Sequence, residues 1–136
     1  MLTKSELTRH TYNILNVAIE VHKFLGPGLL ESVYHRCMKK EMQLRGYPFI
    51  SEITVPVAYK GLEIDADLRC DFLYAGCIAI ELKSVDYMAP VFQAQLLTYM
   101  KLLEAPKGIL INFNVVNIFN EGQQTFVNEL YRNLPE

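Results

Sequence analysis

The sequence lacks several features that would assign it to a class of protein at once. It has no apolar run of about 18 residues, so no transmembrane helix is expected. Met1-Leu2-Thr3-Lys4 does not open a signal peptide, and there is no internal repeat or low-complexity linker. The net charge of -2 is not the basic balance common among nucleic-acid binders. We therefore expect a cytoplasmic protein that does not contact a membrane.

Cysteine is also scarce. Cys37, Cys70 and Cys77 are odd in number and lack the spacing of metal ligands, so reduced, mostly buried thiols are expected rather than a zinc site or a disulfide framework. What the chain does have is 136 residues, of which 51% are hydrophobic. That is enough to bury a real core, and it argues against disorder. One domain spanning residues 1–136 is expected.

Local patterns predict an α/β fold. Thr3 and Glu6 match a capping box that begins a first helix, and Gly26-Pro27-Gly28 ends it. The other expected elements follow in order: a helix over 29–45, strands over 53–59 and 62–74 joined at Lys60-Gly61, a strand over 77–83, a helix over 90–103, a strand over 107–113, a short strand within 114–120 and a helix over 125–134. The order α-α-β-β-β-α-β-(β)-α describes a mixed β-sheet flanked by helices. A helical crossover would make the strand over 107–113 parallel to that over 77–83.

Charged residues gather where two of these strands meet. Glu81 and Lys83 are two apart on a strand and share a face. A three-residue loop would place Asp71 directly opposite Glu81, whereas a two-residue loop would shift that pairing by one. Hard divalent cations prefer carboxylate oxygens, and a metal ion beside a lysine can activate water against a phosphodiester. The pattern therefore favours a hydrolytic metal site.

A cross-strand ion pair is the alternative interpretation of the same residues. The strand over 77–83 is nearly all apolar before Glu81, which predicts a central position in the sheet. Charges at the end of a central strand are costly unless they are paired or used. Both interpretations stay open from the residues alone.

Three residues on predicted helices are candidates for the same pocket. Gln95 and Tyr99 are four apart and share a helix face, either as a boundary glutamine with a core tyrosine or as an accessory pair at the site. Glu31 is either an acid favoured at a helix N-terminus or a further carboxylate for the metal. His10 and His35 show no pattern that indicates a partner.

Several short motifs together resemble a known family. Residues 28–34, Gly28-Leu29-Leu30-Glu31-Ser32-Val33-Tyr34, match the Gly-x-x-Glu-x-x-Tyr signature of the GxxExxY proteins, a group similar to the PD-(D/E)XK nuclease superfamily. The segments 19–22, 25–28, 80–83 and 94–97 are also similar to that family. The resemblance covers roughly residues 8 to 134.

The resemblance implies a restriction-endonuclease-like domain with Mg²⁺- or Mn²⁺-dependent nuclease activity on nucleic acid, with DNA the expected form. It implies these roles: Asp71 as the motif aspartate, Glu81 as the second metal-binding acid, Lys83 as the catalytic lysine, Glu31 as the early-helix acid, the Leu82 carbonyl as a metal ligand, and Gln95 with Tyr99 as the accessory pair. Gln93 departs from the acid that relatives often carry there, so no metal-binding or orienting role is assigned to that position.

Two other functions compete with an active nuclease. A catalytically inactive PD-(D/E)XK-fold binding module is favoured by the near-neutral charge and the short chain. A small DNA junction resolvase would act as a homodimer, since two strands must be cut symmetrically. The complete set of two acids and a lysine argues against the inactive module.

Overall fold

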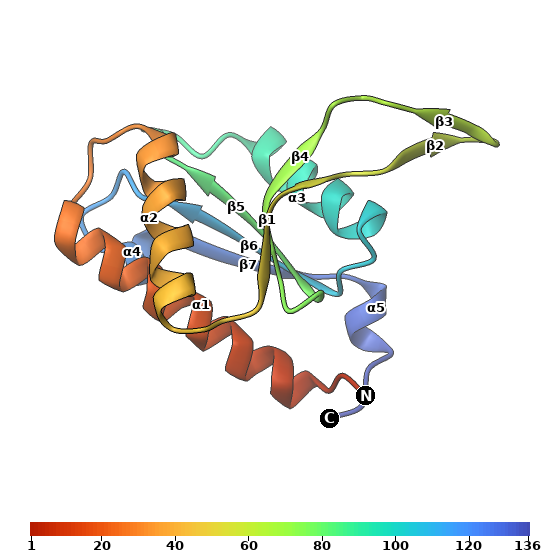
Figure 1. The fold of residues 1–136 in the computed structure, drawn as a ribbon, viewed down its shortest axis with the longest axis horizontal. Helices are drawn as coiled ribbons and strands as arrows, with labels where there is room; N and C mark the ends of the chain where they lie inside the picture. Colours follow the sequence, from red (N-terminus) through yellow and green to blue (C-terminus); the bar gives the residue numbers. More distant parts are fainter.

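The computed structural model describes residues 1–136 as a five-stranded mixed sheet with helices on both faces (Figure 1). The strands lie in the order β1-β4-β5-β6-β7. Their bounds are β1 Phe49–Thr54, β4 Arg69–Tyr74, β5 Ile78–Lys83, β6 Lys107–Asn112 and β7 Gln123–Val127. The expected restriction-endonuclease-like α/β class is confirmed.

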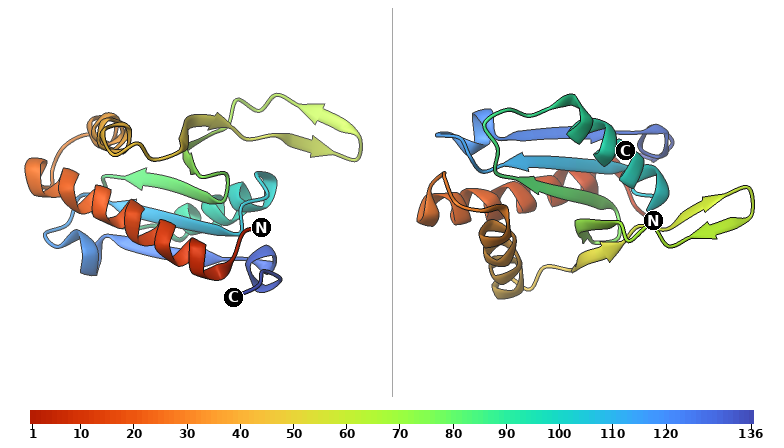
Figure 2. Two further views of the ribbon diagram at one scale, coloured as in Figure 1. Left: turned by 60° about the horizontal axis from the view of Figure 1, so that its bottom comes forward. Right: turned by 90° about the horizontal axis from the view of Figure 1, so that it is seen from above.

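Two hydrophobic clusters hold the sheet between the helices. On one face, α1 (Lys4–Leu25) and α2 (Glu31–Leu44) pack on side chains such as Phe72, Ile80 and Leu82. On the other face, α3 (Pro90–Leu102) packs on side chains such as Leu73 and Ala79. Figure 2 shows the helices on opposite sides of the strands. The side chains of β5 alternate between these two clusters, and the strand is buried except at Lys83.

The predicted N-cap of α1 is present, since the Glu6 backbone N–H donates to the Thr3 hydroxyl at 3.1 Å, and that hydroxyl donates to Oε1 of Glu6 at 3.3 Å in place of the reciprocal backbone bond of a capping box. The chain ends near that cap, where the Lys4 N–H donates to the Pro135 carbonyl at 2.8 Å. The predicted parallel arrangement of the strands over 77–83 and 107–113 is confirmed, because β5 pairs in parallel with β6. None of the helices combines the length and the apolar character that crossing a membrane would require.

The connection between β4 and β5 sets the position of the charged residues. β4 ends at Tyr74 and β5 begins at Ile78, with Ala75 and Gly76 both at positive φ between them. The antiparallel register pairs Phe72 with Ile80. The three-residue loop is therefore confirmed, and one further step of the same register places Asp71 opposite Glu81.

The two long strands expected before this point are each interrupted. Residues 53–59 divide into β1 and β2 (Val57–Tyr59), and residues 62–74 divide into β3 (Leu62–Ile64) and β4. Pro56 lies at the first break, where it has no N–H to donate to a ladder. β2 and β3 pair only with each other, and their two-residue turn has Lys60 at φ 49° and Gly61 at φ 86°. This hairpin projects from the body of the molecule (Figures 1 and 2).

The prediction for the last quarter of the chain was wrong in two places. Residues 114–120 contain no strand, and the short helix α4 (Ile118–Glu121) begins there with Asn117 as its cap. Residues 125–134 are not one helix, because β7 continues to Val127 and α5 spans only Glu129–Arg132. Residues 123–127 pair with the edge of β6 that β5 leaves open, and this pairing makes them a strand despite their helical pattern. The three cysteines are free, with Cys70 and Cys77 buried.

Candidate active site

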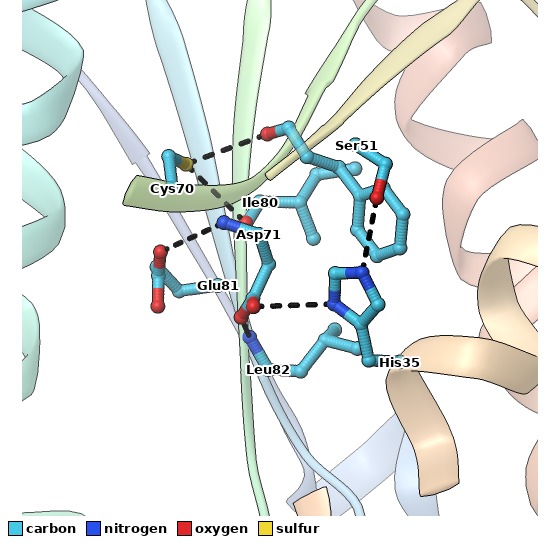
Figure 3. A network of polar contacts seen from close by, with 8 residues as sticks. His35, Ser51, Cys70, Asp71, Ile80, Glu81 and Leu82 are labelled. Atoms are coloured by element: carbon cyan, nitrogen blue, oxygen red, sulfur yellow. Dashed lines mark hydrogen bonds and ion pairs between the residues drawn. The ribbon is translucent and has the colours of Figure 1, made fainter. Parts of the chain in front are cut away.

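The candidate site lies where β4 and β5 carry Asp71 and Glu81 side by side (Figure 3). The Asp71 backbone N–H donates to Oε1 of Glu81 at 3.1 Å. Oδ2 of Asp71 accepts a 2.8 Å hydrogen bond from the backbone N–H of Leu82. Each acid is therefore tied to the backbone of the neighbouring strand, and the two carboxylates are held close together.

The strand changes its facing at Asp71. Cys70 and Leu73 both pack in the cluster beneath α3, while Phe72 between them packs against the α1 and α2 face. In a regular strand, residues 70 and 72 would share a face. On the neighbouring strand Glu52, which lies beside Asp71, has φ 51°. This local irregularity directs the Asp71 carboxylate toward α2, while Glu81 stays on the α3 side (Figure 3).

His35 is a site residue that the sequence did not indicate. Its Nδ1 lies 3.2 Å from Oδ1 of Asp71, and its Nε2 lies 3.1 Å from the Ser51 hydroxyl. Because a carboxylate only accepts, Nδ1 of His35 donates to Asp71, and Nε2 shares a hydrogen bond with the Ser51 hydroxyl. Its ring stacks on Phe72, with centroids 4.4 Å apart. His35 is four residues after Glu31, so helical spacing alone could have placed both on the site-facing side of α2.

Glu81 is the most perturbed acid in the site. Its residue is only 6% exposed. Burial, and next the Asp71 carboxylate, raise the pKa of Glu81 well above its usual range, while Lys83 and the hydrogen bond from Asp71 oppose that rise. A buried carboxylate is thus held where removing its proton costs free energy.

Lys83 and Glu31 complete the charged group. The pKa of Glu31 is raised above its usual value. Partial desolvation is the largest cause, Lys83 opposes it, and Asp71 adds to it. The same lysine lowers the pKa of Glu81, so its charge acts on acids from both sides of the sheet. Its ammonium group lies 4.6 Å from the centre of the Phe92 ring, a cation–π contact with α3 that fixes its position.

The two accessory candidates on α3 differ in their surroundings. Tyr99 is 5% exposed, and its pKa is raised by burial first and then by Glu81, so it lies within electrostatic reach of that acid. Gln95 is on an exposed part of α3, and its side chain makes no hydrogen bond. Gln93 instead donates to Gln124 at 3.0 Å. An accessory role for Gln95 stays a prediction.

The tyrosine of the Gly-x-x-Glu-x-x-Tyr pattern, Tyr34, makes contacts that stabilise the fold. Tyr34 is fully buried; its hydroxyl donates to the Gly26 carbonyl at 2.6 Å and accepts from the Leu29 N–H at 3.2 Å. Its ring stacks on Phe113. Gly28 has φ 94°, a conformation that favours glycine. The pattern therefore fixes the turn that delivers Glu31 to the start of α2.

A polar cavity of about 570 Å³ opens on the α2 side of the site. No hydrophobic residue lines it. The lining residues are Glu31, Ser32, His35, Arg36, Lys39, Ser51, Glu52 and Asp71. No group of three or more His, Cys, Asp or Glu side chains is spaced to hold a metal ion as the side chains stand.

The donor chemistry nevertheless fits a divalent cation. A carboxylate has about four lone-pair positions, and the two hydrogen bonds to Asp71 leave others free. Burial first, and Asp71 in addition, raise the pKa of Glu81 and of Glu31, so ionising these acids costs free energy that a bound cation would offset. Hard oxygen donors of this kind suit Mg²⁺ or Mn²⁺.

Comparisons with known proteins agree with this geometry. Neither the curated proteins nor the solved structures gave a match. A family model described as the PD-(D/E)XK nuclease superfamily matches residues 8–125, and members of that superfamily generally use divalent metals. Since the match spans most of the chain and includes every site residue above, the protein belongs to the PD-(D/E)XK nuclease superfamily.

Proposed function

We propose that this protein is a Mg²⁺- or Mn²⁺-dependent nuclease that hydrolyses phosphodiester bonds in DNA. We further propose that it is a cytoplasmic protein of the GxxExxY group, folded as one PD-(D/E)XK domain over residues 1–136. The observation that best supports the activity is the pairing of Asp71 with Glu81, with Lys83 two residues further along β5. A purely structural ion pair would not need the buried Glu81 beside the half-buried Asp71.

Four groups would hold the metal: the carboxylates of Glu31, Asp71 and Glu81 and the carbonyl of Leu82. When bound, the ion would supply a water of lowered pKa and neutralise phosphate charge. Asp71 is held for this role by His35 and by the Leu82 N–H. Partners of this kind orient a ligating carboxylate before the ion arrives.

Lys83 would stabilise negative charge that develops on the phosphate oxygens, or orient the attacking water. Its contact with Phe92 limits the positions of the ammonium group. Tyr99 and Gln95, one turn apart on α3, would position the scissile phosphate or the metal ligands. Tyr99 has the stronger support, because it is buried within reach of Glu81.

A cleavage assay tests the activity. Purified protein is incubated with labelled single-stranded, duplex and branched DNA in Mg²⁺, Mn²⁺ or chelator. We expect divalent-dependent cleavage of at least one substrate. Lys83→Ala should lower turnover at least ~100-fold, the scale of one lost electrostatic stabiliser. Lys101→Ala, an exposed lysine of α3, is the matched control and should keep wild-type turnover. Equal turnover in Lys83→Ala and wild type would remove Lys83 from the mechanism.

One observation favours the inactive binding module as a second candidate. The acids do not stand as a ready-made group of three metal ligands. An inactive module would bind nucleic acid without cutting any of the three substrates, with or without divalent ions. The same assay therefore separates the two functions when binding is measured alongside cleavage.

A further inference from the structure

The middle of α2 concentrates positive charge in a chain whose net charge is -2. Arg36, Lys39 and Lys40 are all exposed and none takes part in an ion pair, whereas Arg45, directly after the helix, is paired with Glu41 at 2.8 Å. Free cations on an otherwise acidic protein form a local patch that the net charge conceals. Such a patch is what binding to a phosphate backbone requires.

Two of these three cations face the candidate active site. Arg36 and Lys39 line the same polar cavity as Asp71 and His35. Lys40 lines a different groove, between α1 and α2, together with apolar residues that include Phe24. Arg36 lines that groove as well as the polar cavity, whereas Lys39 lines only the polar cavity. Adjacent lysines on one helix therefore serve different surfaces.

We propose that Arg36 and Lys39 bind a backbone phosphate of the DNA strand that is cut, next to the scissile phosphate. This inference rests on the proposed nuclease function and adds a substrate contact to it. The spacing is suitable: Lys39 is four residues beyond His35, or about 6 Å along the helix. The contacted phosphate would therefore be a near neighbour, along the same strand, of the one held at Asp71.

The chemistry of the two side chains divides the contact. The planar guanidinium of Arg36 can donate two parallel hydrogen bonds to phosphate oxygens, and Lys39 adds a point charge. Ser32, which also lines the cavity, offers a hydroxyl donor. Contacts to phosphate fix the position of the strand without reading its sequence. The site would therefore cut with little base preference at this position.

Binding to a short labelled single-stranded DNA tests the assignment. Anisotropy is measured over a range of salt in chelator and in Mg²⁺, with cleavage followed on a gel. The double variant Arg36→Ala/Lys39→Ala should bind roughly 10-fold more weakly at low salt, and its salt slope should fall by about 0.7 for each phosphate that the protein no longer neutralises. Lys40→Ala removes a positive charge from the neighbouring position and should stay within about twofold of wild type. Arg36→Lys/Lys39→Arg keeps both charges and should retain most of the affinity.

The outcomes separate this inference from the proposed function. Wild type that binds or cuts DNA while the double variant matches it in affinity and salt slope overturns the inference alone. Equal losses in Lys40→Ala and the double variant also overturn it, because general charge would then explain binding. Wild type that binds without cutting, with the loss confined to the double variant, supports the inference and overturns the nuclease function. Wild type that neither binds nor cuts overturns both.

Discussion

Asp71, on the α2 side of the site, and Glu81, on the α3 side, have different surroundings. On the α2 side, Asp71 accepts from the Leu82 N–H and from His35, which continues to Ser51. On the α3 side, Glu81 is 6% exposed and takes its hydrogen bond from the Asp71 N–H. Both acids lie at the same level of the sheet, yet only one has a chain of polar partners.

This difference assigns separate tasks to the two sides. The α2 side positions a carboxylate, since hydrogen bonds to the charged form fix its orientation. The α3 side keeps a carboxylate in a buried setting that raises the pKa of Glu81 and disfavours its ionised form. A cation bound between the two sides would remove that penalty, whereas in its absence the penalty acts on the stability of the fold.

The largest expected effect comes from removing the partnered acid. Asp71→Ala leaves the Leu82 N–H unpaired in a residue that is fully buried, and it also removes the His35 interaction. An unsatisfied buried donor and a missing hydrogen bond together should lower the free energy of unfolding by about 3 kcal/mol. Urea unfolding in chelator measures this loss.

Asp67→Ala is the matched control for that variant. Asp67 is 84% exposed in its side chain, and its contact with Arg69 is a surface ion pair. Such pairs contribute at most about 1 kcal/mol. Equal losses in the two variants would show that the Asp71 hydrogen bonds do not hold the site together.

Neutralising the buried acid should have the opposite sign. Glu81→Gln keeps an oxygen that can accept from the Asp71 N–H and removes the free-energy cost of holding Glu81 protonated above its usual pKa, so it should raise the free energy of unfolding by roughly 2 kcal/mol at neutral pH in chelator. Glu63→Gln, an exposed acid of the hairpin, should change nothing. A loss of stability in Glu81→Gln would contradict the assignment of strain to Glu81.

The pH dependence of wild type follows from the same shift. Because the pKa of Glu81 is raised in the folded state, the folded chain keeps a proton that the unfolded chain loses above about pH 4.3. Its contribution to stability is therefore complete below that pH and is lost as pH rises toward the folded pKa. Melting in chelator should show this decline in wild type, and Glu81→Gln should lack it; identical slopes would disprove the linkage.

A smaller effect is expected from the partner of Asp71. His35→Ala removes one hydrogen bond to a half-buried carboxylate, which should cost about 1 kcal/mol of stability. Divalent affinity should weaken by about 10-fold, since Asp71 would lose its orientation. Calorimetric titration with Mn²⁺ measures the affinity, and His10→Ala on α1 is the control. Unchanged Mn²⁺ affinity in His35→Ala would mean that Asp71 needs no positioning.

The sequence predicted the half of the site that follows from local geometry. Strand periodicity placed Asp71 opposite Glu81 for a three-residue loop and one position away for a two-residue loop, and the register of the structure selects the three-residue loop. Helical spacing could place His35 on the same side of α2 as Glu31, but it could not reveal that His35 reaches Asp71, because that contact joins residues 36 positions apart in the chain. It also could not show which acid is strained. With Asp71 well partnered, neutralising Glu81 rather than Asp71 is the change that should relieve repulsion.

The fold was predictable to a similar depth. Capping and turn signals gave the first two helices, Lys60-Gly61 gave the hairpin of β2 and β3, and the apolar run of β5 gave the centre of the main sheet. β7 was missed because its pairing with β6, rather than its own pattern, makes it a strand. The two long strands were predicted without their breaks, because near Pro56 the hairpin of β2 and β3 leaves the main sheet and forms a sheet of its own. Both errors concern tertiary pairing, which a local pattern does not encode.

The central claim is that the acids on the two sides of the sheet share one divalent cation. Thermal melting of wild type and Glu81→Gln, in chelator and in Mn²⁺ or Mg²⁺, tests it without any substrate. An ion at ~10 times its dissociation constant should stabilise wild type by about 1.4 kcal/mol, or a few degrees in melting temperature. Glu81→Gln should begin above wild type in chelator and gain little from the ion. If wild type melts at the same temperature with and without either ion, the shared cation site is contradicted.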